Sequence, residues 1–273
     1  MTHAWLPRAS CDDSCIRLEP VGDFGRAVRA LRGALRCLLV LTLLPAVPIL
    51  VMPLPGQGRA VRLYSRILLR GMGVRVARSG GPIRNVPGVL VVSPHISWVD
   101  VLVIYALVSG AFVAKAELIR WPAPGVLARM MNVIPIDRAR LRRLPDIVDA
   151  VAARLRSGQN VVAFPEGTTW CGLAHGPFRP AMFQAAIDAG RPVQPLRLTY
   201  HYRDGRPSTA VAFVGSDNLA RSFLRIVSSR ATVAHVHVEA LQLPGEHRRD
   251  LALRCQEAVR GAAAARHEHA LAA

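Results

Sequence analysis

The sequence has almost no lysine, few acidic residues and few aromatic ones. Lys115 is its only lysine, aromatic residues make up 5% of the 273 residues, and 35 basic residues outnumber 18 acidic ones to give a net charge of +17. Such an excess predicts an anionic partner: nucleic acid, acidic lipid or a phosphorylated substrate. The scarcity of aromatic residues, with no zinc-finger spacing and no aromatic-plus-basic RNA signature, argues against nucleic acid. The remaining candidate partners are an anionic membrane surface and a phosphorylated substrate.

The sequence also lacks a disulfide framework, a paired metal-binding cysteine pattern and a serine-hydrolase elbow. Its five cysteines are odd in number and scattered, which indicates a reducing compartment. Cys11-x-x-x-Cys15 has no matching second pair, so we expect no metal site there, and Cys171 is interpreted as a packing residue. The pair His267 and His269 is too isolated to predict a metal site. No Gly-x-Ser-x-Gly segment is present, which disfavours a serine hydrolase.

The apolar run at residues 37–52 is short, with 16 residues of which two are proline. A straight membrane-spanning helix needs about 20 residues. On both sides of the run, arginines recur at helical spacing: Arg26, Arg29, Arg32, Arg36, Arg59, Arg62, Arg66 and Arg70. We therefore expect residues 26–80 to form a basic and apolar helical hairpin that enters one leaflet, with its arginines on lipid phosphates and both ends on the cytoplasmic face. The alternatives are a helical pair packed on the core with arginines facing water, and a true membrane span.

The rest of the sequence indicates one α/β domain with two terminal appendages. We expect a disordered tail at residues 1–25, the α/β domain at 81–246 and a C-terminal helical tail at 247–273. Apolar, often β-branched runs predict strands at residues 89–92, 112–114, 133–136, 161–164, 193–198, 210–214 and 233–238. Helices are predicted at residues 98–108, 122–131, 143–156, 180–189 and 216–229. This alternation predicts a layered, largely parallel mixed sheet with flanking helices.

The strand at 89–92 leads into a candidate catalytic pair. It stops at Ser93 and Pro94, His95 follows, and Asp100 comes five residues later at the start of a new apolar run. Histidine titrates close to neutral pH and a carboxylate can orient its ring, so His95 is a candidate general base and Asp100 its partner. Ser97-x-x-Asp100 is also a capping-box variant, in which Asp100 serves only the first turn of a helix. The two side chains can meet only if His95 lies in the loop and Asp100 in that first turn.

Polar groups also mark three other predicted strands. The strand at 161–164 runs into a Phe-Pro-Glu-Gly-Thr segment at residues 164–168, which leaves an acid and hydroxyls at its end. The strand at 133–136 ends in Asp137 and Arg138. Alternatively, these two residues form a surface ion pair, which contributes little to stability. A fourth strand begins with Val-Gln-Pro-Leu at residues 193–196. Because these segments come in order at strand ends, we expect them to line one cleft.

Together these segments resemble the glycerolipid acyltransferase family, of the 1-acyl-sn-glycerol-3-phosphate (lysophosphatidic acid) acyltransferase type. His95 and Asp100 match its His-x4-Asp motif, and residues 136–138, 164–168 and 193–196 are similar to its second, third and fourth blocks. Residues 113–118 are similar to the segment that the family carries between its first two blocks. The resemblance covers roughly residues 85–240, and the N-terminal hairpin resembles the two-helix membrane element of bacterial members.

The resemblance implies transfer of a fatty acyl group from acyl-CoA or acyl carrier protein to the free hydroxyl of a lysolipid, most specifically 1-acyl-sn-glycerol-3-phosphate, to give phosphatidic acid. His95 would be the general base and Asp100 its orienting partner, and no metal or other cofactor is implied. The implied substrate-binding residues are Lys115, Arg138, Glu166, Gly167 and Thr168. We expect a peripheral or monotopic protein at the cytoplasmic face of the inner membrane.

Two residues depart from the family pattern. Pro94 stands where the family often has Asn, and Thr169 stands where it often has Arg, which removes one expected phosphate-binding cation. This variant resembles a bacterial branch that includes lyso-ornithine lipid acyltransferases, so that lipid is the alternative acceptor. An alternative of a different class is a protein that binds anionic lipid without catalysis.

Overall fold

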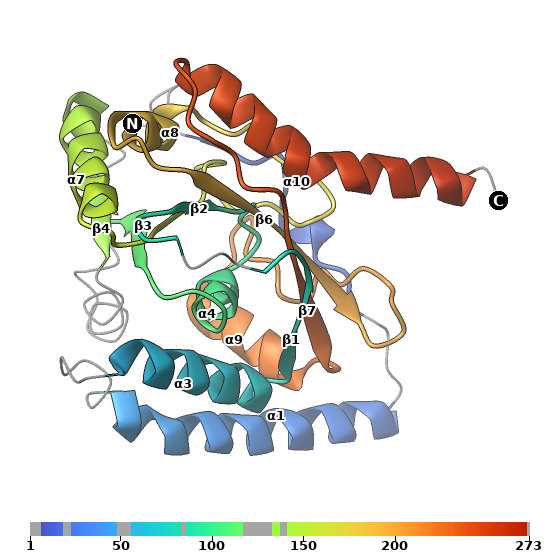
Figure 1. Ribbon diagram of the computed structural model, residues 1–273. Helices are drawn as coiled ribbons and strands as arrows, with labels where there is room; N and C mark the ends of the chain where they lie inside the picture. The colour runs from blue at the N-terminus through green and yellow to red at the C-terminus, as the bar shows by residue number, and fades with distance from the viewer. Residues whose placement is uncertain are drawn as a thin grey trace.

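The computed structural model describes residues 7–18, 23–47, 56–82, 86–116, 133–136 and 141–271. At its centre is a seven-stranded sheet with the order β1-β7-β6-β2-β5-β3-β4 (Figure 1). Neighbouring strands run parallel except β6 and β7, which are antiparallel. The strands are β1 (Val74–Gly80), β2 (Leu90–Val92), β3 (Ala111–Lys115), β4 (Ile134–Ile136), β5 (Val161–Ala163), β6 (Val193–Tyr202) and β7 (Thr232–Val238). The predicted α/β class with a largely parallel sheet is confirmed.

Helices cover both faces of the sheet (Figure 1). Successive residues of the central strands alternate between two cores, since Val91 packs into one while Leu90 and Val92 pack into the other. Burial on both faces explains why these strands read as continuous apolar runs. One core includes α4 (Val99–Tyr105) and α9 (Leu219–Ser228), and the other includes α7 (Leu144–Arg156), α8 (Ala181–Asp188) and the first half of α10 (Arg248–Leu271).

The helices predicted at 98–108, 143–156, 180–189 and 216–229 correspond to α4, α7, α8 and α9. The helix predicted at 122–131 lies outside the described residues. Six of the predicted strands correspond to β2 through β7, with the ends shifted by a few residues. The C-terminal tail is helical as expected, and it is anchored on the domain because Leu251 and Cys255 of α10 are fully buried.

The strand predicted at residues 210–214 is wrong, because this buried segment is a loop. Arg225 of α9 donates from Nε to the carbonyl of Ala210 at 2.9 Å and from a terminal nitrogen to that of Ala212 at 2.6 Å. The N–H of Phe213 donates to the carbonyl of Ile96 at 2.9 Å. Because a side chain and a neighbouring loop satisfy these backbone groups, the segment can be buried without a strand partner.

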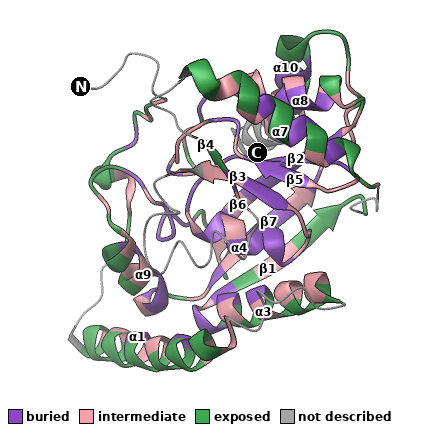
Figure 2. Cartoon of the chain, turned by 90° about the vertical axis from the view of Figure 1, so that its left-hand side faces the viewer, coloured by how far each residue is buried: buried purple, intermediate pink, exposed green. Residues whose placement is uncertain are grey.

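The N-terminal element consists of α1 (Asp23–Leu43), the short η2 (Leu44–Ala46) and α3 (Gln57–Gly71). α1 and α3 lie side by side along one side of the molecule, where α1 packs on α9 and α3 packs on α4 (Figure 1). Their outward faces are exposed (Figure 2). Within the described ranges, no helix is long and apolar enough to cross a membrane.

Some of the arginines expected on lipid phosphates instead bind the protein. Arg36 donates to the carbonyls of Val227 and Ser229 at the end of α9, at 3.0 and 2.8 Å. Arg66 donates to the carbonyl of Ala106 just after α4, and Arg62 donates to a serine hydroxyl in the same connection. Positive groups at helix C-termini are favourable because those ends carry partial negative charge. These bonds therefore dock the two N-terminal helices on the α/β domain.

Residues 74–80, assigned to the hairpin from the sequence, form β1 and pair in parallel with β7. The preceding helix ends at Gly71, and Gly73 turns the chain with a φ of 85°. A Cβ at Gly73 would lie 2.3 Å from the Arg36 guanidinium and would displace it, and the positive φ itself favours glycine. The helical part of the hairpin is therefore shorter than expected, and the sheet gains an edge strand.

The disordered tail expected at residues 1–25 is wrong for residues 7–18, which are ordered against the domain. Asp13 accepts hydrogen bonds from the backbone and hydroxyl of Ser216, and the N–H of Arg17 donates to Thr209 at 2.8 Å. Cys11 is buried, and a short helix η1 (Asp13–Cys15) begins after Asp12. Polar residues thus tie this segment to loops that lie some 200 positions away in the chain.

Candidate active site

The loops that follow β2 and β5 form the candidate site. These strands are parallel neighbours, with Val92 opposite Ala163, so both chains leave the sheet at the same edge. The Glu166 carboxylate joins the two loops, because its Oε2 accepts a hydrogen bond from the backbone N–H of His95 at 2.9 Å. The N–H of Trp170 adds a second link by donating to the carbonyl of His95 at 2.7 Å.

His95 and Asp100 lie in contact. His95 Nδ1 is 2.9 Å from Asp100 Oδ2, with His95 in the loop and Asp100 in the first turn of α4. The same carboxylate oxygen accepts the backbone N–H groups of Ile96 at 2.6 Å and Ser97 at 2.9 Å. Asp100 therefore organises the turn before the helix and also holds the histidine ring. The two interpretations of the motif are compatible.

The hydrogen bonds of Asp100 fix the tautomer of His95. Oδ1 accepts from the hydroxyl of Tyr200 in β6 at 2.7 Å, so both carboxylate oxygens act as acceptors. Nδ1 of His95 then has to be the donor, which leaves the lone pair on Nε2. Burial raises the pKa of Tyr200 well above its usual value, and the charge of Asp100 raises it further, so Tyr200 remains a donor. The arrangement leaves Nε2 as a base.

Phe164 supports the imidazole from one face. The two rings are stacked with centroids 4.0 Å apart and planes inclined by 13°. The side chain of His95 is 19% exposed, whereas that of Asp100 is fully buried. A ligand can therefore reach the histidine but not the carboxylate that orients it.

Glu166 is buried and bonds to the backbone on both sides. Besides the N–H of His95, it accepts the N–H of Gly176 through Oε1 at 3.1 Å. Burial raises the pKa of its carboxyl to about 7, although these two hydrogen bonds act in the opposite direction. Glu166 thus holds two loops together, and its expected role in shaping the acceptor site stays a prediction.

The residues after Glu166 form a tight turn. Gly167 has a φ of 75°, and a Cβ there would lie 2.7 Å from the ring of Pro7. Thr168 is half-buried beside it. Thr169, which replaces the arginine common in the resembled family, donates its hydroxyl to the carbonyl of Phe213 at 2.5 Å. The position thus serves loop packing here.

Lys115 is the last residue of β3, at the edge of the sheet where β2 and β5 also end. Arg138 and its neighbour Asp137 lie outside the described residues. The backbone therefore places Lys115 at the correct edge for a role in the site, and the expected role of Arg138 stays a prediction.

Two residues of the site were not expected from the sequence. Tyr200 bonds Asp100 from a strand 100 positions away, and no local motif marks it. Phe164 was included in the Phe-Pro-Glu-Gly-Thr segment but was given no role, although that segment could have placed it beside His95.

One group of side chains within the described ranges could hold a metal ion, and it lies outside the His95 site. Its members are Cys11, Cys15 and Cys171. No metal site was expected there from the sequence, because Cys11-x-x-x-Cys15 has no matching second pair and Cys171 was interpreted as a packing residue.

A family model described as Acyltransferase matches residues 77–199 of the chain. This span includes His95, Asp100 and Glu166 and ends one residue before Tyr200.

The chain is similar to relatives that are named for two different acceptor lipids. The chain is 35% identical over 183 residues to the 1-acyl-sn-glycerol-3-phosphate acyltransferase of Neisseria meningitidis, covering 66% of this chain and 71% of the relative. It is 34% identical over 211 residues to the lyso-ornithine lipid O-acyltransferase of Pseudomonas aeruginosa, covering 76% and 79%.

The fold is similar to the crystal structure of PlsC, the 1-acyl-sn-glycerophosphate acyltransferase of Thermotoga maritima. The TM-score is 0.64 at 18% sequence identity, with 85% of this chain and 95% of that chain covered.

Proposed function

The chain belongs to the acyltransferase family, and from that premise we propose that it transfers a fatty acyl group from an acyl thioester to the free hydroxyl of a lysolipid. The donor is acyl-CoA or acyl carrier protein, and the first acceptor is 1-acyl-sn-glycerol-3-phosphate, which would give phosphatidic acid. The observation that carries the proposal is the accessible imidazole of His95, held through Nδ1 by the buried carboxylate of Asp100. Because the chain is an acyltransferase, the alternative of a non-catalytic lipid-binding protein is withdrawn.

In the proposed reaction, Nε2 of His95 takes the proton of the acceptor hydroxyl while its oxygen attacks the thioester carbonyl. The new C–O bond forms, the C–S bond breaks, and the proton passes to the departing thiolate. Asp100 keeps the ring in the required tautomer and stabilises the transient imidazolium. The acceptor's own hydroxyl is the nucleophile, so the reaction needs no acyl-enzyme and no metal.

The substrate would bind at the same edge of the sheet. We assign Lys115 and Arg138 to the acceptor phosphate, which an arginine can hold with two hydrogen bonds. Glu166, Gly167 and Thr168 shape the acceptor side, because the turn they form lies against the loop of His95.

Lyso-ornithine lipid is the second candidate acceptor. One observation favours it: the hydroxyl of Thr169 bonds the carbonyl of Phe213, so this position offers no cation to an acceptor phosphate. An acceptor without a phosphate would not need that cation.

We also infer that α1 and α3 attach the protein to the surface of an anionic membrane, at the cytoplasmic face of the inner membrane. The outward face of α1 carries apolar side chains at steps of three and four residues: Phe24, Val28, Leu31, Leu35 and Leu38. Leu63 and Ile67 extend the exposed apolar surface on α3. Beside α3 and β1, a pocket of about 620 Å³ is lined by the basic side chains of Arg62, Arg66, Arg70 and Arg78. Apolar burial combined with cationic side chains is how interfacial helices bind lipid.

The direct test is a panel of lysolipids incubated with purified protein and one labelled acyl-CoA, with the products identified by mass spectrometry. We expect acyl transfer to 1-acyl-sn-glycerol-3-phosphate. Product from lyso-ornithine lipid alone would select the second candidate.

His95→Ala is expected to lower kcat by at least a thousandfold, because the base is removed, while vesicle binding stays unchanged. His235→Ala, at an exposed histidine of β7, is a control and should retain activity. Activity in His95→Ala close to that of the wild type would contradict the mechanism.

A further inference from the structure

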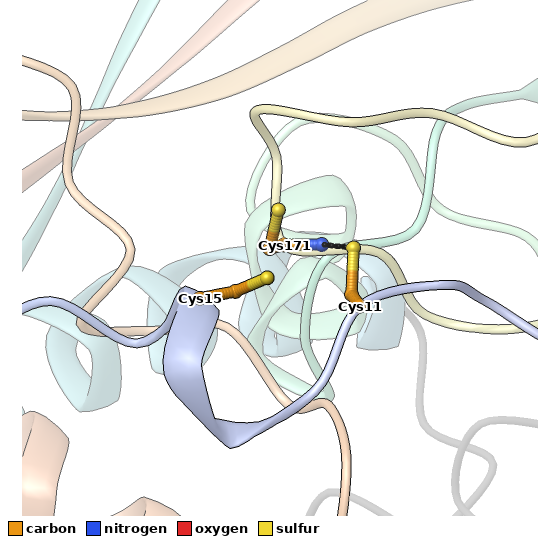
Figure 3. A group of neighbouring side chains, drawn as sticks. All are labelled: Cys11, Cys15 and Cys171. Carbon is orange, nitrogen blue, oxygen red and sulfur yellow. Dashed lines mark hydrogen bonds between the residues drawn. The ribbon is translucent and has the colours of Figure 1, made fainter.

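The candidate metal cluster brings together three thiols from two segments of the chain. The Sγ atoms of Cys11, Cys15 and Cys171 all lie within 4.8 Å of one another (Figure 3). Cys11 and Cys171 are buried and Cys15 is half-buried. Cys11 precedes η1 and Cys15 is its last residue, whereas Cys171 follows the Glu166 turn of the candidate active site.

The separation of the thiols suits a thiophilic metal ion. A zinc–sulfur bond of about 2.3 Å places two tetrahedral thiolate ligands about 3.8 Å apart. The cluster therefore has to contract by about an ångström at most to reach coordination distances. Thiolates favour zinc and similar soft ions over magnesium or calcium, which prefer oxygen ligands.

The surroundings of the sulfur atoms are organised by backbone donors. The N–H of Cys171 lies 3.4 Å from Sγ of Cys11 and donates to it (Figure 3). A backbone donor at a sulfur atom favours the thiolate, the form that binds a metal.

We propose that Cys11, Cys15 and Cys171 form a binding site for one zinc-class metal ion. Within the described ranges the group has three members, so the fourth tetrahedral position is assigned to water on the half-exposed side of Cys15. The alternative is that three buried thiols pack as small hydrophobic side chains. Metal uptake distinguishes the two and needs no acyl substrate, so the proposal stands independently of the proposed function.

A metal ion here would clamp the N-terminal segment onto the active-site loop. Cys171 directly follows Trp170, whose N–H donates to the carbonyl of His95. Closing a loop of about 160 residues removes much conformational freedom from the unfolded chain. The ion would therefore stabilise the fold and also hold the loop that supports His95.

The test uses the full chain, reduced with a phosphine and stripped of metal by a chelator, then titrated with Co²⁺. We expect one equivalent of Co²⁺ to produce a thiolate charge-transfer band and the visible bands of a tetrahedral ion, and Zn²⁺ to bleach both. Binding by the tail residues His267 and His269 would give no thiolate band, so the spectrum separates the two locations.

Substitutions identify the ligands. Cys15→Ser, at the most exposed member, and Cys171→Ser should weaken Zn²⁺ binding by about a hundredfold or more, since even residues that only support metal ligands cost 10- to 100-fold. Cys37→Ser and Cys255→Ser are matched controls and should bind like the wild type. No thiolate band in the wild type, or a band of full intensity in both Cys15→Ser and Cys171→Ser, would overturn the proposal. A Cys11–Cys171 disulfide with no metal uptake after its reduction would overturn it as well.

Discussion

Asp100 receives four hydrogen bonds, from the ring of His95, the backbone of Ile96 and Ser97, and the hydroxyl of Tyr200. A buried carboxylate needs such partners because burial away from water penalises its charge. The bonds to the backbone shape the turn, and the bonds to the two side chains fix the ring of the base. One residue thus links the geometry of a helix start to the orientation of the proposed base.

Tyr200→Phe is expected to lower kcat about tenfold with little change in KM. The change leaves Oδ1 of Asp100 buried without its donor, so the carboxylate orients His95 less firmly. Steady-state kinetics and urea unfolding of the variant provide the measurement. Tyr105→Phe is the control. This buried hydroxyl donates to the carbonyl of Gly110 at 2.9 Å, a contact outside the candidate active site. Equal loss of kcat in both variants would contradict a specific role for Tyr200.

Glu166 should make stability depend on pH. Burial raises its pKa to about 7 from an ordinary value of 4.5, so between these values the folded chain holds a proton that the unfolded chain has released. Its stabilising contribution is complete below pH 4.5 and is lost as the pH rises through about 7. Relative to Glu166→Gln, the free energy of unfolding of the wild type should fall by about 3 kcal/mol over this range.

Urea unfolding at a series of pH values tests this expectation. Glu257→Gln, at an exposed position on α10, should leave the pH dependence of the wild type unchanged. If the curves of the wild type and Glu166→Gln run parallel across the range, Glu166 does not titrate as stated.

The sequence predicted His95 and Asp100 because their contact is local. Five positions, a proline break and a helix start were enough to bring the two side chains together. Tyr200 and the Cys11–Cys171 contact could not be predicted in this way, since each depends on how distant segments pack. A single sequence carries periodicity within a segment but no register between segments.

At the scale of elements, local apolar patterns predicted the buried strands, whereas contacts between distant segments explain the wrong predictions. Strands such as β2 and β5 were identified because burial on both faces makes them continuously apolar. Residues 210–214 are equally apolar, yet Arg225 binds their carbonyls and no strand forms. β1 was missed because its arginines continued the basic pattern of α3, although Val74, Arg75 and Val76 alternate as a strand does.

Arg36 is expected to fasten α1 to α9, so Arg36→Met should lower the free energy of unfolding by about 2 kcal/mol. The substitution removes two charge-assisted hydrogen bonds to the last carbonyls of α9 and leaves these acceptors unpaired. Urea unfolding gives the magnitude, and Arg59→Met, at an exposed position of α3, should change it by less than about 0.5 kcal/mol. Similar losses in the two variants would show that the α1–α9 contact does not depend on Arg36.

At the scale of the whole molecule, the N-terminal helices have two different faces. Their inner faces bind the α/β domain through arginines and small residues, as where Gly33 of α1 abuts Ser228. Their outer faces are apolar and exposed, which is unusual for a surface that meets only water. The helical pair therefore packs on the core and still presents an apolar surface, and its attachment to a membrane stays a prediction.

A double substitution on α1 tests whether that outer surface binds lipid. Leu31 and Leu35 of α1 are 62% and 59% exposed, so replacing both with glutamate should leave the fold intact and reduce binding to anionic vesicles at least tenfold. Each substitution removes apolar area from the membrane interface and adds a charge that anionic lipid repels. Vesicle flotation measures binding, and kcat on a short-chain, water-soluble lysolipid should stay within about twofold of the wild type.

Leu243→Glu combined with Leu253→Glu is the control. These side chains are 67% and 53% exposed. They belong to α10 and the chain just before it, which lie away from α1 (Figure 1). If the α1 variant bound vesicles as tightly as this control, the apolar face of α1 would have to serve a contact other than the membrane.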